Sequence, residues 1–457
     1  MNDRPTSWQR KITMFFTGQS VSLLGSTLVQ YAIVWYITNT SNSGLWVTLS
    51  AISGFAPQIF ITLFAGVWAD RYNRKHLIML ADGGIAVFTL LLSIIMFFGY
   101  REMWMLIVIL AIRSVGSGLQ SPAVTAMIPQ LVPNEHFMRV NGINGTIQSL
   151  VSIAAPAIGG TVLSFGRLEY VLFIDVATAV IGIALLWRIN IPPHIRAANG
   201  QKPDYFTDLK QGIRFALNNY FVRRLLALYV LFTVFLVTPA FLNGLMVRRE
   251  FVPDSTDLEY GYRLLTITES AFLIGAGTGG LLISAWGGFK NRLHTLGAGT
   301  ILFGLAAVLG GVSPQFWMFV ACMAVAGFAV PSINTPVTAL LQQKVGNDMY
   351  GRVYSLFTLT FSAVMPFGMA IFGPLADYIS IRWLMVGSGV MMVVLTLIVF
   401  RMRKFVAEGI VPTAPVPAQT ANQIPIVSPG VAPGVAPGVD SAAGITSDPA
   451  PNPDGAQ

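Results

Sequence analysis

The sequence predicts an all-α polytopic membrane protein with twelve transmembrane helices in two six-helix halves. Of its 457 residues, 54% are hydrophobic and only 11% are charged, whereas about a quarter are charged in ordinary soluble domains. The apolar residues form long uncharged blocks, such as 85–98 and 384–400, which is typical of bilayer-spanning helices. These observations exclude a soluble enzyme, a disulfide-rich secreted domain and a nucleic-acid binder. The net charge of +8 needs no nucleic-acid partner, because cytoplasmic loops of membrane proteins carry excess Lys and Arg.

Apolar blocks separated by polar breaks give the positions of the spans. Each is roughly 20 residues or slightly longer, which suffices to cross a bilayer. The first block is too long for a signal-peptide core and lacks a small-residue cleavage site, so it counts as a span. The expected spans are 12–38, 44–69, 76–98, 103–128, 141–166, 168–188, 225–247, 263–286, 293–312, 315–341, 353–377 and 383–400.

The basic residues predict the orientation. With the N-terminus inside, 21 of the 28 Lys and Arg residues fall on the inner side and six on the outer side, while Arg113 lies within a span. This is the positive-inside pattern. We therefore expect a multi-pass protein of the cytoplasmic membrane with both termini in the cytoplasm.

The longest internal loop divides the spans into two sets. Residues 122–140 resemble 336–353, which indicates two related halves, 1–190 and 225–404, around a central cavity; the alternative is chance similarity of two apolar segments. The linker between them, 191–224, contains apolar residues at helical spacing, which predict an amphipathic helix on the inner membrane surface. These are Phe206, Leu209, Ile213, Ala216, Leu217 and Tyr220.

The residues after Lys404 differ in composition from the rest of the chain. They are rich in Pro, Gly and Ala and include the repeat PGVAPGVAPGVD at 429–440. Such a stretch lacks the aromatic and charged content needed to pack. We expect 405–457 to be a disordered cytoplasmic tail.

A charged turn joins the second and third spans. Gly66, Asp70, Arg71, Arg74 and Lys75 match the loop motif G-x-x-x-D-R-x-G-R-R/K of the major facilitator superfamily. In that superfamily the aspartate and arginines latch the two halves at the cytoplasmic side, so the resemblance implies an inner gate here. Asn73 replaces the usual glycine, a mild departure because Asn also tolerates a left-handed turn. The alternative is an ordinary solvated loop.

Arg113 is the basic residue placed inside a predicted span. An intramembrane arginine is costly unless it faces a cavity or a partner, so it is a functional candidate. The run from Arg113 to Gly118 is similar to the superfamily's fourth-helix arginine motif, which is linked to proton transfer. A purely structural ion pair is the alternative.

The fifth span carries Pro156, Gly159 and Gly160. They resemble the antiporter motif G-x-x-x-G-P-x-x-G-G, with Val151 and Ala155 in place of its leading glycines. Proline and paired glycines bend a helix and allow close packing, which suits an interface that rocks. Any proline-kinked membrane helix shares these features.

Three acidic residues lie in or near the spans: Asp82, Asp175 and Glu269. A carboxyl group that switches between a neutral and a charged state is what a proton-coupled antiporter needs. Glu269 ranks first because the close-packing run 275–280 follows it, and Asp175 ranks second. We expect Asp82 to pair with the inner loop charges. For each acid the alternative is a helix–helix hydrogen bond.

Other polar and aromatic residues are candidates to line a cavity for a large amphipathic substrate. They are Gln30, Tyr31, Trp35, Gln58, Gln148 and Asn334. The sequence has no ATP-binding P-loop, its four histidines fall in or beside the inner loops, and its single cysteine is alone. We therefore expect no enzymatic activity, no cofactor and no metal site.

Beyond these motifs, the chain resembles the macrolide-efflux type of drug:proton antiporter. The similar stretches run from the first span to the eleventh and include 18–23, 65–75, 112–116, 128–133, 267–269 and 351–356. The resemblance implies a major facilitator fold and export of macrolide antibiotics driven by the proton gradient. Relatives in the same branch export siderophores, so fold and mechanism carry over better than substrate.

We therefore predict a secondary active transporter that exports amphipathic drugs, macrolides foremost, in exchange for protons by alternating access. Glu269 and Asp175 are the candidate proton carriers, and Arg113 is a candidate relay or partner. The expected partners are a small amphipathic substrate, protons and the lipid bilayer, with no nucleic acid, and we expect a monomer. The alternatives are an exporter of siderophores or other metabolites, an importer, and a transporter-like sensor that does not translocate.

Overall fold

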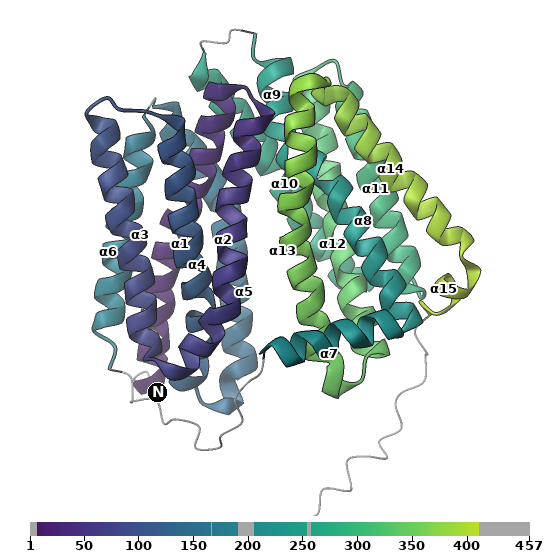
Figure 1. Cartoon of the computed structure of the whole chain (residues 1–457), viewed down its shortest axis with the longest axis horizontal. Helices are drawn as coiled ribbons and strands as arrows, with labels where there is room; N and C mark the ends of the chain where they lie inside the picture. Colours follow the sequence, from purple (N-terminus) through teal and green to yellow (C-terminus); the bar gives the residue numbers. More distant parts are fainter. Residues whose placement is uncertain (1–6, 166, 191–204, 254–256, 411–457) are drawn as a thin grey trace, which may run out of the picture. The chain divides into compact units, whose positions relative to one another are not determined.

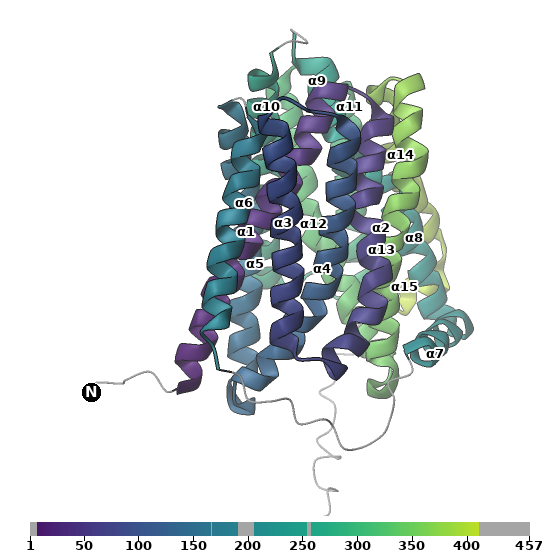
Figure 2. The same cartoon turned by 60° about the vertical axis from the view of Figure 1, so that its left-hand side comes forward.

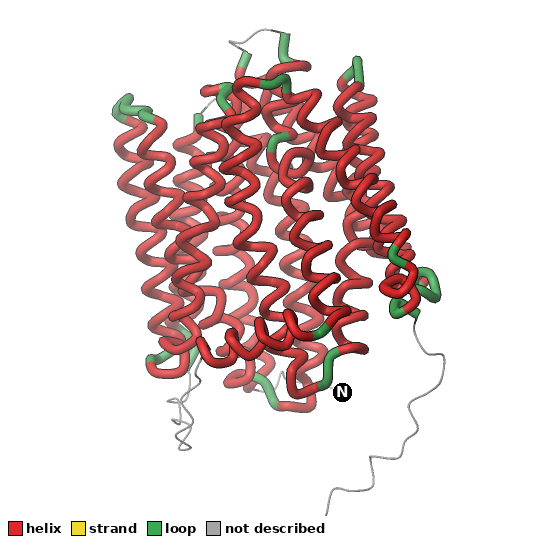
Figure 3. Tube along the Cα trace, turned by 45° about the vertical axis from the view of Figure 1, so that its right-hand side comes forward, coloured by secondary structure: helices red, strands yellow, loops and turns green. Residues whose placement is uncertain are grey.

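The computed structural model describes residues 7–165, 167–190, 205–253 and 257–410, whose regular elements are helices (Figure 3). Twelve helices in this part of the chain are long and apolar enough to cross a membrane, which confirms the predicted fold class. The helices are α1 Ser7–Ser41, α2 Gly44–Arg71, α3 Arg74–Phe97, α4 Met103–Leu131, α5 Phe137–Ser164, α6 Leu168–Trp187, α7 Tyr205–Asn218, α8 Tyr220–Phe241, α9 Asn243–Phe251, α10 Leu258–Trp286, α11 Arg292–Val312, α12 Phe316–Lys344, α13 Asn347–Tyr378, α14 Ile381–Arg401 and α15 Arg403–Ala407.

The short connections between the long helices lie at two opposite ends (Figure 1). We call the end where α1 joins α2 the Asn42 end, and the end where α2 joins α3 the Arg74 end. Helix α7 lies at the Arg74 end, across the ends of its neighbours α8 and α13. The amphipathic helix predicted within 191–224 is therefore present as α7, while residues 191–204 lie outside the described part.

Helices α1 to α6 pack mainly on one another, as Figure 2 shows, and α8 to α14 form a second set. Between the sets, α2 packs against α13, α5 against α10, and α1 against α9 and α10. All of these helices belong to one compact unit that ends at Val411. Descent of the two sets from one repeated half remains a prediction.

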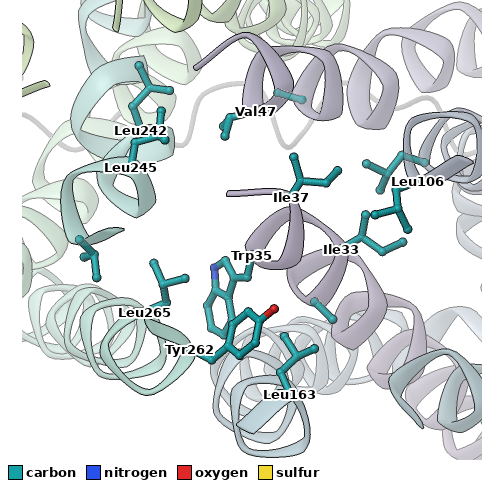
Figure 4. Packing of buried hydrophobic residues seen from close by; sticks show 14 of the residues in the cluster. Ile33, Trp35, Ile37, Val47, Leu106, Leu163, Leu242, Leu245, Tyr262 and Leu265 are labelled. Carbon is teal, nitrogen blue, oxygen red and sulfur yellow. The ribbon is translucent and has the colours of Figure 1, made fainter. Parts of the chain in front are cut away.

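The hydrophobic cores differ between the two ends. The largest cluster of buried side chains lies toward the Asn42 end and draws residues from both sets, including Ile37, Val47, Leu245 and Leu265 (Figure 4). Toward the Arg74 end each set has its own cluster. Phe15 and Met127 belong to the cluster of α1–α6, whereas the cluster that contains Phe221 and Phe405 is built from α7–α15. The two sets therefore share a hydrophobic core at one end and have separate cores at the other.

The seventh predicted span, 225–247, is broken into two helices. Pro239 lies in the last turn of α8, and α9 begins at Asn243 after the break at Leu242. Pro239 has no backbone N–H to bond the carbonyl of residue 235, and its ring displaces the turn before it, so α8 is weakened just ahead of the break. The break is not visible in hydropathy, because residues on both sides of it are apolar.

The folded part extends beyond the predicted start of the tail. Phe405 is only 1% exposed within α15, and the backbone of Ile410 forms a bridge with Asn291. Placing the start of a disordered tail at 405 was therefore wrong by at least six residues. The apolar side chain of Phe405 packs against Phe221, a tertiary contact that composition does not reveal. Residues 411–457 lie outside the described part.

Candidate functional site

Two adjoining cavities lie between the helix sets. The first, of about 220 Å³, is lined from α1, α2, α8, α9, α10 and α13, and the second, of about 270 Å³, from α1, α8, α10 and α12. They share the residues Tyr31, Ala240, Phe241 and Glu269. Most of the walls are apolar or aromatic, with a few polar groups, which is the usual composition of a small-molecule site.

Glu269 of α10 lines both cavities. The hydroxyl of Tyr31 on α1 donates to its Oε1 across 3.4 Å, so this contact joins the two helix sets. Asn243, which the break after α8 places at the start of α9, hydrogen-bonds the same carboxylate through its side chain. The first-ranked acid of the sequence prediction thus lies in the central cavity.

The structure brings four of the six predicted lining residues to these cavities. Gln30, Tyr31 and Trp35 line the first, and Tyr31 and Asn334 line the second. Gln58 and Gln148 line neither cavity. The backbone N–H of Gln58 donates to Ser114 Oγ at 2.9 Å, because this part of α2 packs against α4, and Gln148 is exposed on α5.

Arg113 and Asp175 form an ion pair inside the first helix set. They are 3% and 1% exposed, and the arginine also donates to Thr89 Oγ1 at 2.9 Å and to the Ser26 carbonyl at 3.1 Å. The Ser26 hydroxyl donates to the other oxygen of Asp175 at 3.3 Å. The two candidates therefore meet each other rather than Glu269.

Asp82 does not pair as the sequence suggested. Its Oδ1 accepts a hydrogen bond from Gln120 Nε2 on α4, and its side chain is buried. The expected partners, Lys75 and Arg74, bond to helix-end carbonyls instead. Asp82 lies about two turns into α3, which carries it away from the loop, since each residue rises about 1.5 Å.

The charged turn between α2 and α3 ties together elements of the first helix set. Arg74 donates to the carbonyls of Ala69 at 2.9 Å and Ala126 at 2.6 Å. Lys75 donates to the carbonyls of Trp187 at 2.8 Å and Ile189 at 2.9 Å. Ala69 and Trp187 lie in the last turns of α2 and α6, where carbonyls lack intrahelical partners and cations also complement the helix dipole.

The other members of this motif have less defined contacts. Asn73 is extended, with φ −66°, and caps α3 by accepting from the N–H of Lys75 at 3.0 Å. The left-handed turn suggested for this position is therefore wrong; Asn serves as a helix cap. Arg71 is exposed and Gly66 has open space around its Cα. The side chain of Asp70 lies outside the described part.

The glycines of α5 allow close approach to a helix of the same set and to a helix of the other set. A Cβ on Gly160 would collide with Thr266 of α10, and one on Gly159 would press on Leu28 of α1. Pro156 lies within α5, one turn before. The motif predicted from the sequence is thus located where α5 meets α10.

A second link between the sets lies at the Asn42 end and was missed by the sequence reasoning. Asp377, in the last turn of α13, accepts hydrogen bonds from the backbone N–H groups of Gly44 at 2.7 Å and Leu45 at 3.0 Å. Arg249 of α9 donates to the same carboxylate and to the Asn42 carbonyl, at 2.8 and 2.7 Å. The carboxylate therefore caps the N-terminus of α2, where orphan N–H groups favour an anion.

A sequence signal for Asp377 did exist. Residues 373–377 (GPLAD) repeat the spacing of 66–70 (GVWAD), so each acid ends a membrane helix four residues after a glycine. Its partner Arg249 is one of the six basic residues that the sequence places on the outer side, with no signal for this pairing. A Cβ on Gly373 would collide with Thr48, so this glycine allows α13 to approach α2 closely.

Comparison with known proteins agrees with this architecture. The profile of the family of transmembrane secretion effectors matches residues 8–426. Macrolide efflux protein A of Streptococcus pyogenes is 29% identical over 87% of this chain and 96% of its own length. The protein of that name from Enterococcus faecalis is 30% identical over 70% of this chain and 97% of its own. A bacterial homologue of the lysosomal transporter Spinster, in an inward-facing and unoccupied conformation, shares the fold with a TM-score of 0.63 at 15% identity, covering 90% of this chain and all of its own.

The helices, the central cavity and these relatives define a multi-pass membrane transporter of the major facilitator superfamily. Within this superfamily the chain belongs to the transmembrane secretion effectors and is of the macrolide-efflux type. It is an efflux transporter and not an enzyme.

Proposed function

We propose that this chain exports amphipathic drugs, macrolides foremost, across the cytoplasmic membrane in exchange for protons. The observation that carries the proposal is the position of Glu269, an acid in an otherwise apolar and aromatic cavity between the helix sets. The names of the relatives from Streptococcus pyogenes and Enterococcus faecalis support macrolides as substrates. An ionisable group inside the membrane is costly and belongs to transport pathways by default.

The transport cycle is alternating access between the two helix sets. The shared hydrophobic core and the Asp377 cap support closure at the Asn42 end, while separate cores support a division at the Arg74 end. The excess of basic residues assigns the Arg74 end and both termini to the cytoplasm. The structure then corresponds to a form in which the cavity is closed toward the outside.

Proton coupling is assigned to Glu269 first. It faces the cavity, so its carboxyl group is within reach of both substrate and proton. Asp175 is held by Arg113 and packed within one helix set, which supports a positioning role for this pair. A monomer is the proposed working unit.

The test is accumulation of labelled erythromycin in a susceptible host that expresses the chain, with and without an uncoupler. Lower accumulation that the uncoupler reverses is the expected result. Cells that carry an empty vector are the control for passive entry and native pumps. Equal accumulation in both strains would contradict macrolide export and direct the assay to siderophores and other amphipathic metabolites.

A further inference from the structure

Five acids in the described part of the chain have arginine partners, whereas buried Asp82 accepts a hydrogen bond from Gln120. Asp175 pairs with Arg113, Glu169 with Arg101, Glu250 with Arg382, Glu259 with Arg263 and Asp377 with Arg249. These pairs balance the charge of each carboxylate locally. Glu269 follows a different pattern.

The described residues that line the two cavities around Glu269 include no lysine, arginine or histidine. Its hydrogen-bond donors are the hydroxyl of Tyr31 and the side-chain amide of Asn243, which are neutral. A carboxylate has about four acceptor positions, so two neutral donors leave it able to accept more. The Glu269 carboxylate is thus a negatively charged hydrogen-bond acceptor that no cationic side chain of the described cavity lining balances.

Aromatic rings surround this carboxylate. Tyr31, Trp35, Phe55 and Phe241 line the first cavity, and Phe272 lines the second. The faces of such rings attract cations, and their bodies bury apolar surface. Because these walls are mostly apolar and aromatic, a charge pair formed here is stronger than one formed in bulk water.

We propose that the protonated amine of the substrate is the counterion of Glu269, so that the transporter selects amphipathic molecules with a basic nitrogen. This inference rests on the proposed export function and names the chemical class of its substrate. The ammonium group binds the carboxylate at the level of Tyr31 and Asn243, and the apolar body of the substrate occupies the aromatic walls. A neutral molecule of the same shape gains only the second of these interactions.

The same arrangement couples the substrate to the proton. Glu269 balances its charge with either a bound proton or a bound ammonium group, and the two exclude each other at the same oxygens. The titratable groups that face it from the neighbouring helices are Tyr31 on α1 and Tyr229 on α8, both neutral phenols. Release of the amine therefore accompanies uptake of a proton, which is the exchange that antiport requires.

The test is a binding measurement on the purified full-length chain in lipid nanodiscs with three matched probes. They are erythromycin, which has a dimethylamino group; its quaternary N-methyl derivative, which is permanently charged; and its N-demethyl-N-acetyl derivative, which is neutral. We expect both cations to bind at least about ten-fold more tightly than the neutral amide, because each carries a positive charge that the carboxylate and the aromatic faces attract. Equal affinities for the three probes would overturn the proposal.

Variants test whether Glu269 is the residue that causes the preference for cationic probes. In Glu269→Gln the ten-fold preference should disappear while the affinity for the neutral amide stays unchanged, which also shows that the cavity is folded. Glu259→Gln, on the exposed face of the same helix, is the matched control and should keep the preference. Glu269→Asp retains the negative charge and should keep most of the preference for cationic probes. A preference that survives in Glu269→Gln would overturn the assignment to this residue.

The experiments distinguish failure of the amine-recognition proposal from failure of the proton-coupling proposal. Uncoupler-sensitive export of the neutral amide at the rate of erythromycin would overturn the amine requirement and leave proton-coupled export standing. Loss of uncoupler sensitivity with an intact cation preference would overturn proton coupling and leave the recognition by Glu269 standing.

Discussion

The hydroxyl of Tyr31 on α1 donates to Glu269 on α10 across 3.4 Å, between two helix sets that lie on opposite sides of the central cavity. The contact forms only while the two sets are close together at this level, because Tyr31 belongs to one set and Glu269 to the other. A conformational change that separates the sets at this level therefore breaks it. In the proposed cycle, substrate binding, protonation and helix movement all involve this carboxylate.

Glu269→Gln removes the ionisable group and keeps the size of the side chain. We expect proton-driven efflux of erythromycin to be lost while the protein still folds and inserts, since the amide replaces the carboxylate in nearly the same space. Accumulation assays with and without uncoupler measure the loss, and Glu259→Gln is the control. Transport against a gradient at the full rate would reduce Glu269 to a packing residue.

Arg113→Met leaves Asp175 buried without its cation. Breaking a buried ion pair from one side costs about 3–5 kcal/mol, so we expect a clear fall in the unfolding temperature in detergent. The double variant Arg113→Met with Asp175→Leu removes both charges and should recover most of that stability. If this double variant also transports normally, the pair is structural; if it is stable but inactive, the pair takes part in proton movement.

Asp377→Ala removes the cap on α2 and the partner of Arg249. A cap is worth about 1 kcal/mol, so we expect opening of the Asn42 end to increase about five-fold. A Val47→Cys reporter in a Cys322→Ser background measures this opening through its labelling by a membrane-impermeant maleimide, because Val47 lines the first cavity and is buried.

Glu259→Gln is the matched control for that experiment. It removes a carboxylate of the same end, so it changes the charge in the same direction as Asp377→Ala, but Glu259 pairs with Arg263 on an exposed helix face and does not join the two sets. Labelling that rises equally in Glu259→Gln and Asp377→Ala would show that the general charge of this end, rather than the cap, controls opening.

Gly160→Val tests the close approach of α5 to α10. The new side chain would collide with Thr266, so the helices must move apart and erythromycin efflux should fall by about ten-fold or more, in line with the 1–3 kcal/mol cost of overpacking. Combining Gly160→Ala with Thr266→Ala should restore activity relative to Gly160→Ala alone. Gly142→Ala, on the same helix with open space around it, should have no effect on transport.

Sequence reasoning found those features that depend on local composition. Apolar blocks located the twelve spans, because a bilayer demands a long apolar helix wherever the chain crosses it. A buried acid and a buried arginine are conspicuous for the same reason, so Glu269, Asp175 and Arg113 were identified as candidates. Gln30, Tyr31, Trp35 and Asn334 were found as polar or aromatic exceptions in apolar helices.

Pairings between distant helices were out of reach of the same reasoning. Asp82 was assigned to the loop cations because they are near in sequence, but rotation and rise of α3 direct it to Gln120. Arg249 and Asp377 are separated by 128 positions, and each alone looked like an ordinary charge at a helix end. Phe405 looked like the first residue of a tail until its partner Phe221 was known.

The sequence by itself determined that this chain crosses the membrane twelve times, that Asp175, Glu269 and Arg113 lie within its spans, and which family it resembles. These properties follow from the cost of placing each residue in hydrocarbon, which is a sum over local positions. Only the tertiary structure decided that Arg113 neutralises Asp175, that Asp377 caps α2, and that Glu269 stands in the cavity with neutral partners. Those pairings depend on which faces of distant helices pack against each other, and this packing is a property of the whole chain rather than of any local segment.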